Sequence, residues 1–176
     1  MAELRTAHTT DLDDGTRSAI RGLLDATFSG FTDAAFENSL GGVHALLFEG
    51  TDLVGHGSVV QRRLLYDGRA LRAGYVEAVA VRADRRRRGH GHTMMDALER
   101  VIRAAYDLGA LGASADGAGL YTARGWLRWQ GPSSAVTPGG TRRTADFDGA
   151  IYVLPVSTTL DISRELVCDW RDGRLW

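Results

Sequence analysis

The sequence predicts a single α+β domain, residues 1–176, in which a mixed and mostly antiparallel sheet is flanked by helices. Three observations predict this class. Two helical segments with apolar faces come first, and extended segments joined by tight turns follow them. A strand, a glycine turn and an amphipathic helix come next, before several shorter elements. The length of 176 residues suits one domain with a sizeable core.

The first third of the chain is predicted to form an edge strand and two helices. Residues 4–8 read as a short, half-buried strand. Thr10 or Asp11 is expected to cap the first helix, which a Ser-Gly pair at residues 29–30 ends. Residues 31–40 form a second helical segment, and two glycines stop it.

An antiparallel meander is predicted to follow, with strands at residues 43–48, 53–65 and 74–81. Turn-forming residues at 49–52 and 66–69 separate these strands. Tight turns of this kind join neighbouring antiparallel strands, so the three strands are expected to lie side by side.

The rest of the chain is predicted to consist of short elements after one long helix. Met94, Met95, Leu98, Val101 and Ile102 recur at helical spacing and indicate that helix. The elements expected after it are a strand at 108–114, a helix at 116–124, an extended segment at 126–129, a loop at 131–149, a strand at 151–156 and a helical turn near 162–166.

The strand at residues 74–81 carries an acid in an apolar face. Regular alternation would place Tyr75, Glu77, Val79 and Val81 on one side of the strand. Glu77 is therefore a candidate base for a reaction that removes a proton. The alternative is a structural acid that pairs with an arginine near the end of the strand.

An arginine-rich glycine turn links this strand to the long helix. The first backbone N–H groups of a helix have no partner within it, and together with the helix dipole they favour an anion. Arginines directly before the helix add positive charge and paired donors. We therefore interpret the turn as a pyrophosphate site that consists of Arg86, Arg87, Arg88, Gly89, His90 and Gly91.

Other readings of this turn fit less well. A Rossmann fingerprint needs a third glycine where Met94 stands, and a Walker A loop needs a lysine, which the sequence lacks. The turn could instead be a solvated basic surface that contacts nucleic acid. The formal net charge of -1 and the absence of aromatic residues within the arginine run count against a nucleic-acid-binding protein.

Composition narrows the class further. A hydrophobic content of 44% and a charged content of 24% are ordinary for a soluble globular protein. Cys168 is the one cysteine, so no intrachain disulfide forms, and we expect a buried thiol. His90 and His92 have no third ligand at a metal-binding spacing, so no metal is expected. Without a long apolar run or a signal-peptide core, the expected location is the cytoplasm, with no membrane contact.

Several separated blocks of sequence resemble one enzyme family. They are LGGVHAL at residues 40–46, VQRRL at 60–64, GYVE at 74–77, AYDLG at 105–109, LYTARGW at 120–126 and CDWR at 168–171. With the Arg86-x-x-Gly89-x-Gly91 turn, they resemble the aminoglycoside 2′-N-acetyltransferases of the GNAT superfamily. The blocks cover nearly the whole chain in the order of that family.

The resemblance implies a GNAT fold with splayed central strands, acetyl-CoA as co-substrate and a homodimer. It implies transfer of an acetyl group to the 2′-amino group of an aminoglycoside-type antibiotic. Glu77 would relay the proton of the amine through water, a task shared with the terminal carboxylate of Trp176. The N–H of Val79 would lie near the thioester carbonyl, and Val81 would pair with the pantetheine arm. The backbone of Ser114 would line the cofactor channel.

Tyr121 is the candidate acid that protonates the departing thiolate. Its hydroxyl can donate a proton, and the resemblance places the tyrosine of the family on this short helix. The alternative is a core tyrosine that packs with Leu120 and Trp126.

Acids that hold a polycationic substrate in this family are missing here. The chain has Ala35, Phe147 and Arg174 at three of the matching positions, and no acid follows Gly30. Each charged hydrogen bond contributes about 1.5–3 kcal/mol, so a polycation is expected to bind weakly. An amine with fewer positive charges and its own carboxylate fits better, and kasugamycin is such a compound. The predicted substrate-binding residues are Phe31, Phe36, Glu77, Phe147, Asp148, Arg174 and Trp176.

Two other functions stay open at this point. A GNAT enzyme that acetylates a metabolite or a protein amine would use the same machinery. A nucleic-acid-binding protein would use Arg82 together with residues 85–88, and its binding would weaken steeply with salt.

Overall fold

The computed structural model describes residues 2–176, which group into two compact units. The first unit contains residues 2–60 and 76–101, and the second contains residues 61–75 and 102–176. Two long strands and the long helix contribute residues to both units. We describe each unit by itself, and the prediction of a single domain stays a prediction.

The first unit holds the N-terminal elements and most of the long helix. Its elements are β1 (Ala2–His8), α1 (Asp14–Thr27), α2 (Asp33–Asn38), β2 (Val43–Glu49), the first part of β3 (Asp52–Tyr66), the second part of β4 (Arg69–Val81) and most of α3 (His90–Ala105).

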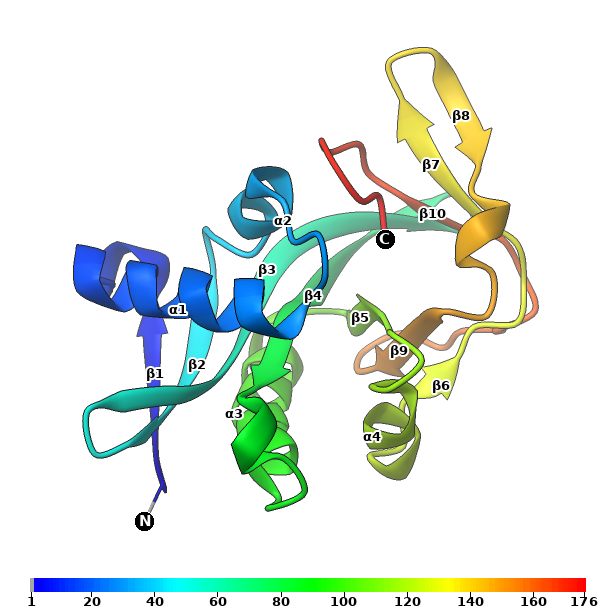
Figure 1. Cartoon of the computed structure of the whole chain (residues 1–176). Helices are drawn as coiled ribbons and strands as arrows, with labels where there is room; N and C mark the ends of the chain where they lie inside the picture. The colour runs from blue at the N-terminus through cyan, green and yellow to red at the C-terminus, as the bar shows by residue number, and fades with distance from the viewer. Residues whose placement is uncertain (1) are drawn as a thin grey trace. The chain divides into compact units, whose positions relative to one another are not determined.

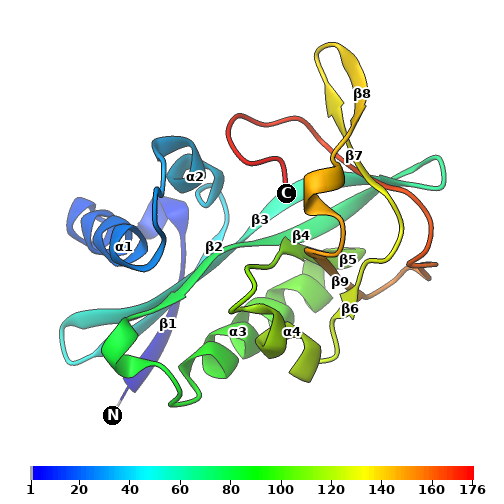
Figure 2. The same cartoon turned by 45° about the vertical axis from the view of Figure 1, so that its right-hand side comes forward.

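The sheet of the first unit is covered on both faces. Strands β1 and β2 pair antiparallel, as do β2 and β3, and β4 lies beside β3. Helices α1 and α2 lie in front of these strands in Figure 1, and Figure 2 shows α3 on their other side. The buried side chains of α1, Ile20, Leu23 and Leu24, cluster with Leu46 and Ala80 of the strands. The predicted strand, helix pair and meander are confirmed.

Helix α3 approaches β3 closely because two glycines face it. A Cβ atom on Gly55 would lie 2.9 Å from the sulfur of Met94, and one on Gly57 would lie 3.1 Å from Cδ1 of Leu98. Both helix side chains are fully buried. The predicted apolar face of this helix is confirmed, and larger residues at the two glycines would push it off the sheet.

The start of α1 differs from the prediction. Asp13 is the N-cap residue, and its carboxylate accepts a 2.6 Å hydrogen bond from the Thr16 amide. Thr10 and Asp11, the predicted caps, belong to a preceding 3-10 turn, η1 (Thr9–Asp11). Several neighbouring residues in this stretch can cap a helix, so the pattern predicted the kind of cap but placed it wrongly.

The second unit contains a mixed sheet. Its remaining elements are β5 (Leu108–Gly112), α4 (Ala118–Ala123), β6 (Leu127–Arg128), β7 (Ser133–Thr137), β8 (Gly140–Arg143), β9 (Ile151–Pro155) and β10 (Leu166–Cys168). The strand order is β6-β9-β5-β4-β3-β10-β7-β8. The β4–β5 and β10–β7 pairs are parallel, whereas β5–β9, β6–β9, β3–β10 and β7–β8 are antiparallel. The predicted mixed and mostly antiparallel sheet is confirmed.

Two predictions for this part of the chain are wrong. Residues 131–149, predicted as a loop, contain the β7–β8 hairpin at one end of the strand order, which Figure 2 shows, and the 3-10 turn η3 (Ala145–Phe147). The predicted helical turn near residues 162–166 ends instead in strand β10. Strand β8 is exposed throughout, so no apolar periodicity marks it, and β10 is only three residues long.

Candidate active site

The turn between β4 and α3 has the backbone geometry of an anion site. A 3-10 turn, η2 (Ala83–Arg85), follows the strand, and Arg87 and Gly89 then have φ angles of 62° and 82°. At the start of α3, the Thr93 amide donates to Gly89 O at 3.1 Å. The first amides of an α-helix have no acceptor one turn earlier in the helix, and together with the helix dipole such a start can bind an anion.

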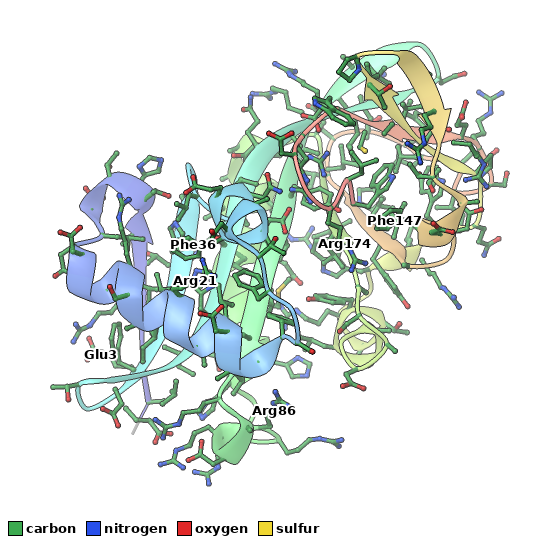
Figure 3. All side chains as sticks on the ribbon, turned by 45° about the horizontal axis from the view of Figure 1, so that its top comes forward. Glu3, Arg21, Phe36, Arg86, Phe147 and Arg174 are labelled. Carbon is green, nitrogen blue, oxygen red and sulfur yellow. The ribbon has the colours of Figure 1, made fainter. Side chains whose placement is uncertain are left out.

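Hydrogen bonds from arginine side chains stabilise this turn, and the arginines leave positive charge on its surface. Arg86 Nε donates to Val81 O at 3.1 Å, and Arg88 Nη2 donates to Asp84 O at 3.3 Å. Both residues are exposed, and Figure 3 shows Arg86 at the turn. Arg85 is instead held by Glu49 at 2.7 Å. The six residues predicted to bind pyrophosphate therefore form one continuous segment, the last two of which begin α3, and their role stays a prediction.

Strand β4 is irregular at Ala78, between Glu77 and Val79. Ala78 has a φ angle of 52°, a left-handed conformation that is uncommon for a non-glycine residue. Ala78 packs against the core cluster under α1, whereas Cγ2 of Val79 lies 3.2 Å from the Cβ position of Gly57, which faces α3. Glu77 is partly buried. The Cβ position of Gly74, five residues before Val79, also faces α3, at 2.8 Å from Cγ1 of Ile102, whereas regular alternation would put the two on opposite faces. The predicted alternation is therefore wrong in this stretch, and the strand bulges around Ala78.

Tyr121 lies on α4 with its ring in the core. The residue is 7% exposed, and its ring centre lies 6.0 Å from that of Trp126 and 6.1 Å from that of Tyr152. Ser114 precedes the helix, and its carbonyl oxygen accepts two amide hydrogen bonds of 3.1 Å from the start of α4. The aromatic packing agrees with the structural alternative for Tyr121, and its role as an acid stays a prediction.

Arg62 holds residues 169–176 against β3, a contact that sequence reasoning missed. The residue is 4% exposed and donates to Asp169 Oδ1 at 2.7 Å, Asp169 O at 3.0 Å and Leu175 O at 2.7 Å. Its guanidinium carbon also lies 4.6 Å from the ring centre of Tyr75. Partners more than 100 residues away leave no local signal, so only the fold identifies this arginine.

Trp176 is fixed by both its side chain and its main chain. The residue is 2% exposed, and its indole Nε1 donates to Thr144 Oγ1 at 2.9 Å. Its main chain lies against β5, where a Cβ atom on Gly112 would come within 3.0 Å of the Trp176 carbonyl carbon. Arg174 Nε donates to Trp176 O at 2.9 Å. The structure therefore brings Trp176 and Arg174, two of the predicted site residues, together.

Phe147 joins the same group, whereas Asp148 is engaged elsewhere. The Arg174 guanidinium lies 5.1 Å from the ring centre of Phe147, and Figure 3 shows the two side chains next to each other. The Asp148 carboxylate accepts from Arg143 Nη1 at 2.9 Å and from Ser133 Oγ at 3.0 Å. Chiefly the hydrogen bonds from Arg143 lower the pKa of Asp148 to about 2. Asp148 is thus a carboxylate already paired within the protein.

Phe31 and Phe36, the other predicted substrate contacts, lie around an arginine. The Arg21 guanidinium is 5.8 Å from the Phe31 ring centre and 5.7 Å from that of Phe36, and Figure 3 shows Arg21 beside Phe36. Arg21 also forms ion pairs with Asp25 at 2.9 Å and with Asp33 at 2.6 Å. The aromatic pair therefore lies beside one arginine and two aspartates, one of which, Asp33, is largely exposed.

The predicted site residues fall into two groups. The first unit contains Phe31, Phe36, Glu77, Val79, Val81, Arg86, Arg87, Arg88, Gly89, His90 and Gly91, and the second contains Ser114, Tyr121, Phe147, Asp148, Arg174 and Trp176. Within residues 2–176, no three or more His, Cys, Asp or Glu side chains gather as metal ligands. In the same residues, no helix is both long and apolar enough to cross a membrane.

Comparison with known proteins identifies the family. Residues 23–128 match the model of the acetyltransferase (GNAT) domain. An aminoglycoside 2′-N-acetyltransferase from Mycolicibacterium fortuitum is 50% identical over 177 residues, which cover 98% of this chain and 91% of that protein.

Solved structures share the fold at low sequence identity. Eis1 from Mycobacterium abscessus has a TM-score of 0.62 at 16% identity, over 76% of this chain and 33% of that chain. The ribosomal-protein-S18-alanine N-acetyltransferase from Escherichia coli has a TM-score of 0.59 at 18% identity, over 92% of this chain and 97% of that chain. This protein therefore has the GNAT fold, is an acetyltransferase, and belongs to the aminoglycoside 2′-N-acetyltransferase family.

Proposed function

We propose that this protein transfers the acetyl group of acetyl-CoA to the 2′-amino group of an aminoglycoside-type antibiotic and so confers resistance. The observation that carries the proposal is the 50% identity, over 98% of the chain, to an aminoglycoside 2′-N-acetyltransferase. The basic turn at residues 86–91 supports it, because exposed arginines and helix-start amides suit the diphosphate of a coenzyme A thioester.

The proposed chemistry begins with attack of a neutral amine on the thioester carbonyl carbon. Glu77 takes the proton of the amine, directly or through a water, and the terminal carboxylate of Trp176 shares this task. The Val79 N–H donates to the carbonyl oxygen as negative charge develops there. The parallel ladder between β4 and β5 covers only residues 73–75 of β4, so Glu77 and Val79 lie in the part of the strand beyond that ladder.

The remaining roles concern the coenzyme. The thiolate that leaves takes a proton from the Tyr121 hydroxyl. Val81 pairs with the pantetheine arm, although Arg86 already uses one acceptor position of its carbonyl oxygen. Ser114 lines the channel through its backbone. The family resemblance also supports a homodimer in the cytoplasm, and light scattering at several concentrations measures the oligomeric state.

We further propose that the acceptor carries few positive charges and a carboxylate, as kasugamycin does. Asp148, the one aspartate among the predicted substrate-binding residues, is already paired with Arg143 within the protein. A polycation would have to compete with this arginine. Arg174 adds an exposed positive charge over Phe147, which suits a substrate carboxylate.

Steady-state assays with kasugamycin, gentamicin and tobramycin test this preference. We expect kcat/KM for kasugamycin to exceed that for either polycation by at least about tenfold, the effect of roughly one charged hydrogen bond. Arg174→Gln is expected to raise KM for kasugamycin and to leave that for tobramycin unchanged or lower. Equal or better turnover of the polycations by the unmodified protein would contradict the kasugamycin preference, and no turnover of any of the three would contradict the wider proposal.

Replacing Tyr121 by phenylalanine separates its two possible roles. If the hydroxyl protonates the thiolate, we expect kcat to fall about 100-fold or more while the KM for acetyl-CoA stays within about twofold. The ring packing against Trp126 and Tyr152 is kept in this variant, so the melting temperature is expected to change little. An unchanged kcat would leave Tyr121 as a core residue only.

A further inference from the structure

A chain of buried hydrogen bonds ends at the irregular residue of β4. Thr9 Oγ1 lies 2.7 Å from His44 Nε2, His44 Nδ1 lies 2.9 Å from His56 Nε2, and His56 Nδ1 lies 3.0 Å from Ala78 O. Both histidines are completely buried, and Thr9 is 9% exposed. All four residues belong to the first unit, where β2 and β3 pair antiparallel and bring the two rings together.

The positions of the protons give this series of hydrogen bonds one direction, from donor to acceptor. A carbonyl oxygen can only accept, so His56 Nδ1 must carry the proton that it shares with Ala78 O. A neutral His56 then accepts at Nε2, which requires the proton of His44 to be on Nδ1. His44 in turn accepts at Nε2, so the Thr9 hydroxyl donates to it. The Thr9 oxygen accepts from the Gly41 amide at 2.8 Å, and of the two acceptors within reach of its one proton, His44 Nε2 at 2.7 Å lies nearer than Gly42 O at 3.2 Å.

Protonation of His56 would break this series of hydrogen bonds. A histidinium donates from both nitrogens, so the Nε2–H of a charged His56 would face the Nδ1–H of His44. A charged His44 would turn the Thr9 hydroxyl toward Gly42 O, 3.2 Å away. Burial lowers the pKa of His44 to about 4 and that of His56 to about 3, and both rings stay neutral near pH 7.

The carbonyl group at the end of this series of hydrogen bonds belongs to Ala78, whose backbone is strained. Ala78 holds a φ angle of 52°, which costs free energy and persists only where surrounding contacts fix it. Its side chain packs in the core cluster under α1, and its carbonyl accepts the His56 proton. These two contacts hold Ala78 from both its side chain and its main chain. The peptide planes on either side of Ala78 set the directions of Glu77 and of the Val79 N–H.

We propose that Thr9, His44 and His56 form a positioning relay that holds the β4 bulge, and with it Glu77 and the Val79 amide, in the orientation required for acetyl transfer. This inference rests on the proposed function, which makes Glu77 the base and Val79 N–H the donor to the oxyanion. None of the three relay residues touches substrate in this proposal; they act through Ala78.

The tautomers of the two rings test the relay in the unmodified protein. Nitrogen-15 NMR of the histidine side chains is expected to show His44 and His56 as neutral Nδ1–H tautomers from pH 5.5 to 8. The remaining histidines provide the internal comparison. A ring in the Nε2–H form at either position, or a transition of either ring within that pH range, would overturn the inference even if no variant folds.

Variants of His56 then test the effect on catalysis. His56→Leu removes the donor to Ala78 O, whereas the side-chain amide of His56→Asn can place an N–H near the position of Nδ1. We expect kcat to fall by about tenfold or more in the leucine variant, with KM for acetyl-CoA within about twofold, because the basic turn is unaffected. The asparagine variant is expected to regain most of the lost kcat.

Ser58→Ala is the matched control. Ser58 is also fully buried on β3, two residues from His56, and its hydroxyl donates to Ser39 O at 2.8 Å without reaching β4. It is expected to lower the melting temperature and leave kcat within about twofold. If His56→Leu keeps kcat, or if its loss is matched by Ser58→Ala or is not relieved by asparagine, the relay has only a structural role.

Glu77→Gln separates this inference from the proposed function. If Glu77→Gln lowers kcat and His56→Leu does not, the relay is wrong and the catalytic role of Glu77 stands. If His56→Leu lowers kcat and Glu77→Gln does not, the assignment of Glu77 fails, and with it the proposal that the relay serves that base.

Discussion

Replacing Glu77 by glutamine is expected to lower kcat by about 10²- to 10³-fold, the usual contribution of a general base. Glutamine has nearly the same shape as glutamate and keeps a hydrogen-bonding side chain beside the β4 bulge, but it cannot take the proton of the attacking amine. The basic turn at residues 86–91 is unchanged, so the dissociation constant for acetyl-CoA, measured by calorimetry, is expected to stay within about twofold.

The pH dependence of kcat sharpens this test. In the unmodified protein, kcat is expected to rise with pH as the base loses its proton, and this limb is expected to disappear in Glu77→Gln. Glu3→Gln provides a control, because Glu3 is an exposed acid of the same unit that pairs with Arg5 on β1. A Glu77→Gln enzyme with the kcat of the Glu3→Gln control would show that Glu77 is only a structural acid.

Mild acid is expected to destabilise this protein, before its carboxylates titrate. The unfolded chain binds a proton at each of His44 and His56 near pH 6.5, whereas the folded protein binds them only near pH 4 and pH 3. Between those values the unfolded state holds more protons, so the free energy of unfolding rises with pH. The stabilising contribution of the two histidines is fully present above about pH 6.5 and is lost as pH falls. Each histidine contributes a slope of up to about 1.4 kcal/mol per pH unit.

Urea unfolding between pH 5.0 and 7.5 measures this slope. Burial is the main cause of both shifts, and the positive charges of His8 and Arg17 add to the shift of His44. Arginine lowers the pKa values of carboxylates such as Asp148 and Glu49. Their contribution to the free energy of unfolding changes only below about pH 4.5, so they do not affect the slope between pH 5.0 and 7.5. His56→Asn is expected to show a shallower slope, and a pH-independent stability in the unmodified protein would contradict the prediction.

The fold was largely predictable because most of its elements carry local signals. Apolar spacing located α1 and α3, and turn residues located the meander, within a few positions of the structure. The β7–β8 hairpin was missed for a physical reason. Strand β8 is exposed along its whole length, and β7 is held by pairing with β10, some 30 residues further along the chain. Such pairing leaves no periodic pattern in either segment.

The candidate site also has parts that the local sequence predicts and parts that it does not. The basic turn could be predicted because helix-start amides, glycines and arginines are neighbours in the sequence. The sequence could not predict the pairing of Asp148 with Arg143 or the contact of Arg21 with two aromatic rings. The pairing of Asp148 changes what the predicted substrate residues offer, since this acid is already paired with Arg143 while Arg174 is exposed.

The sequence by itself determined the order of most helices and strands, the arginine-rich glycine turn and membership of an acetyltransferase family, because each depends on residues that are close together or on blocks of identity. Only the tertiary structure decided that His44 and His56 share a proton chain, that Ala78 interrupts β4 and that Arg62 holds Asp169 and Leu175. Strand register and long-range hydrogen bonds bring those groups together, and neither is encoded in any short stretch of the chain.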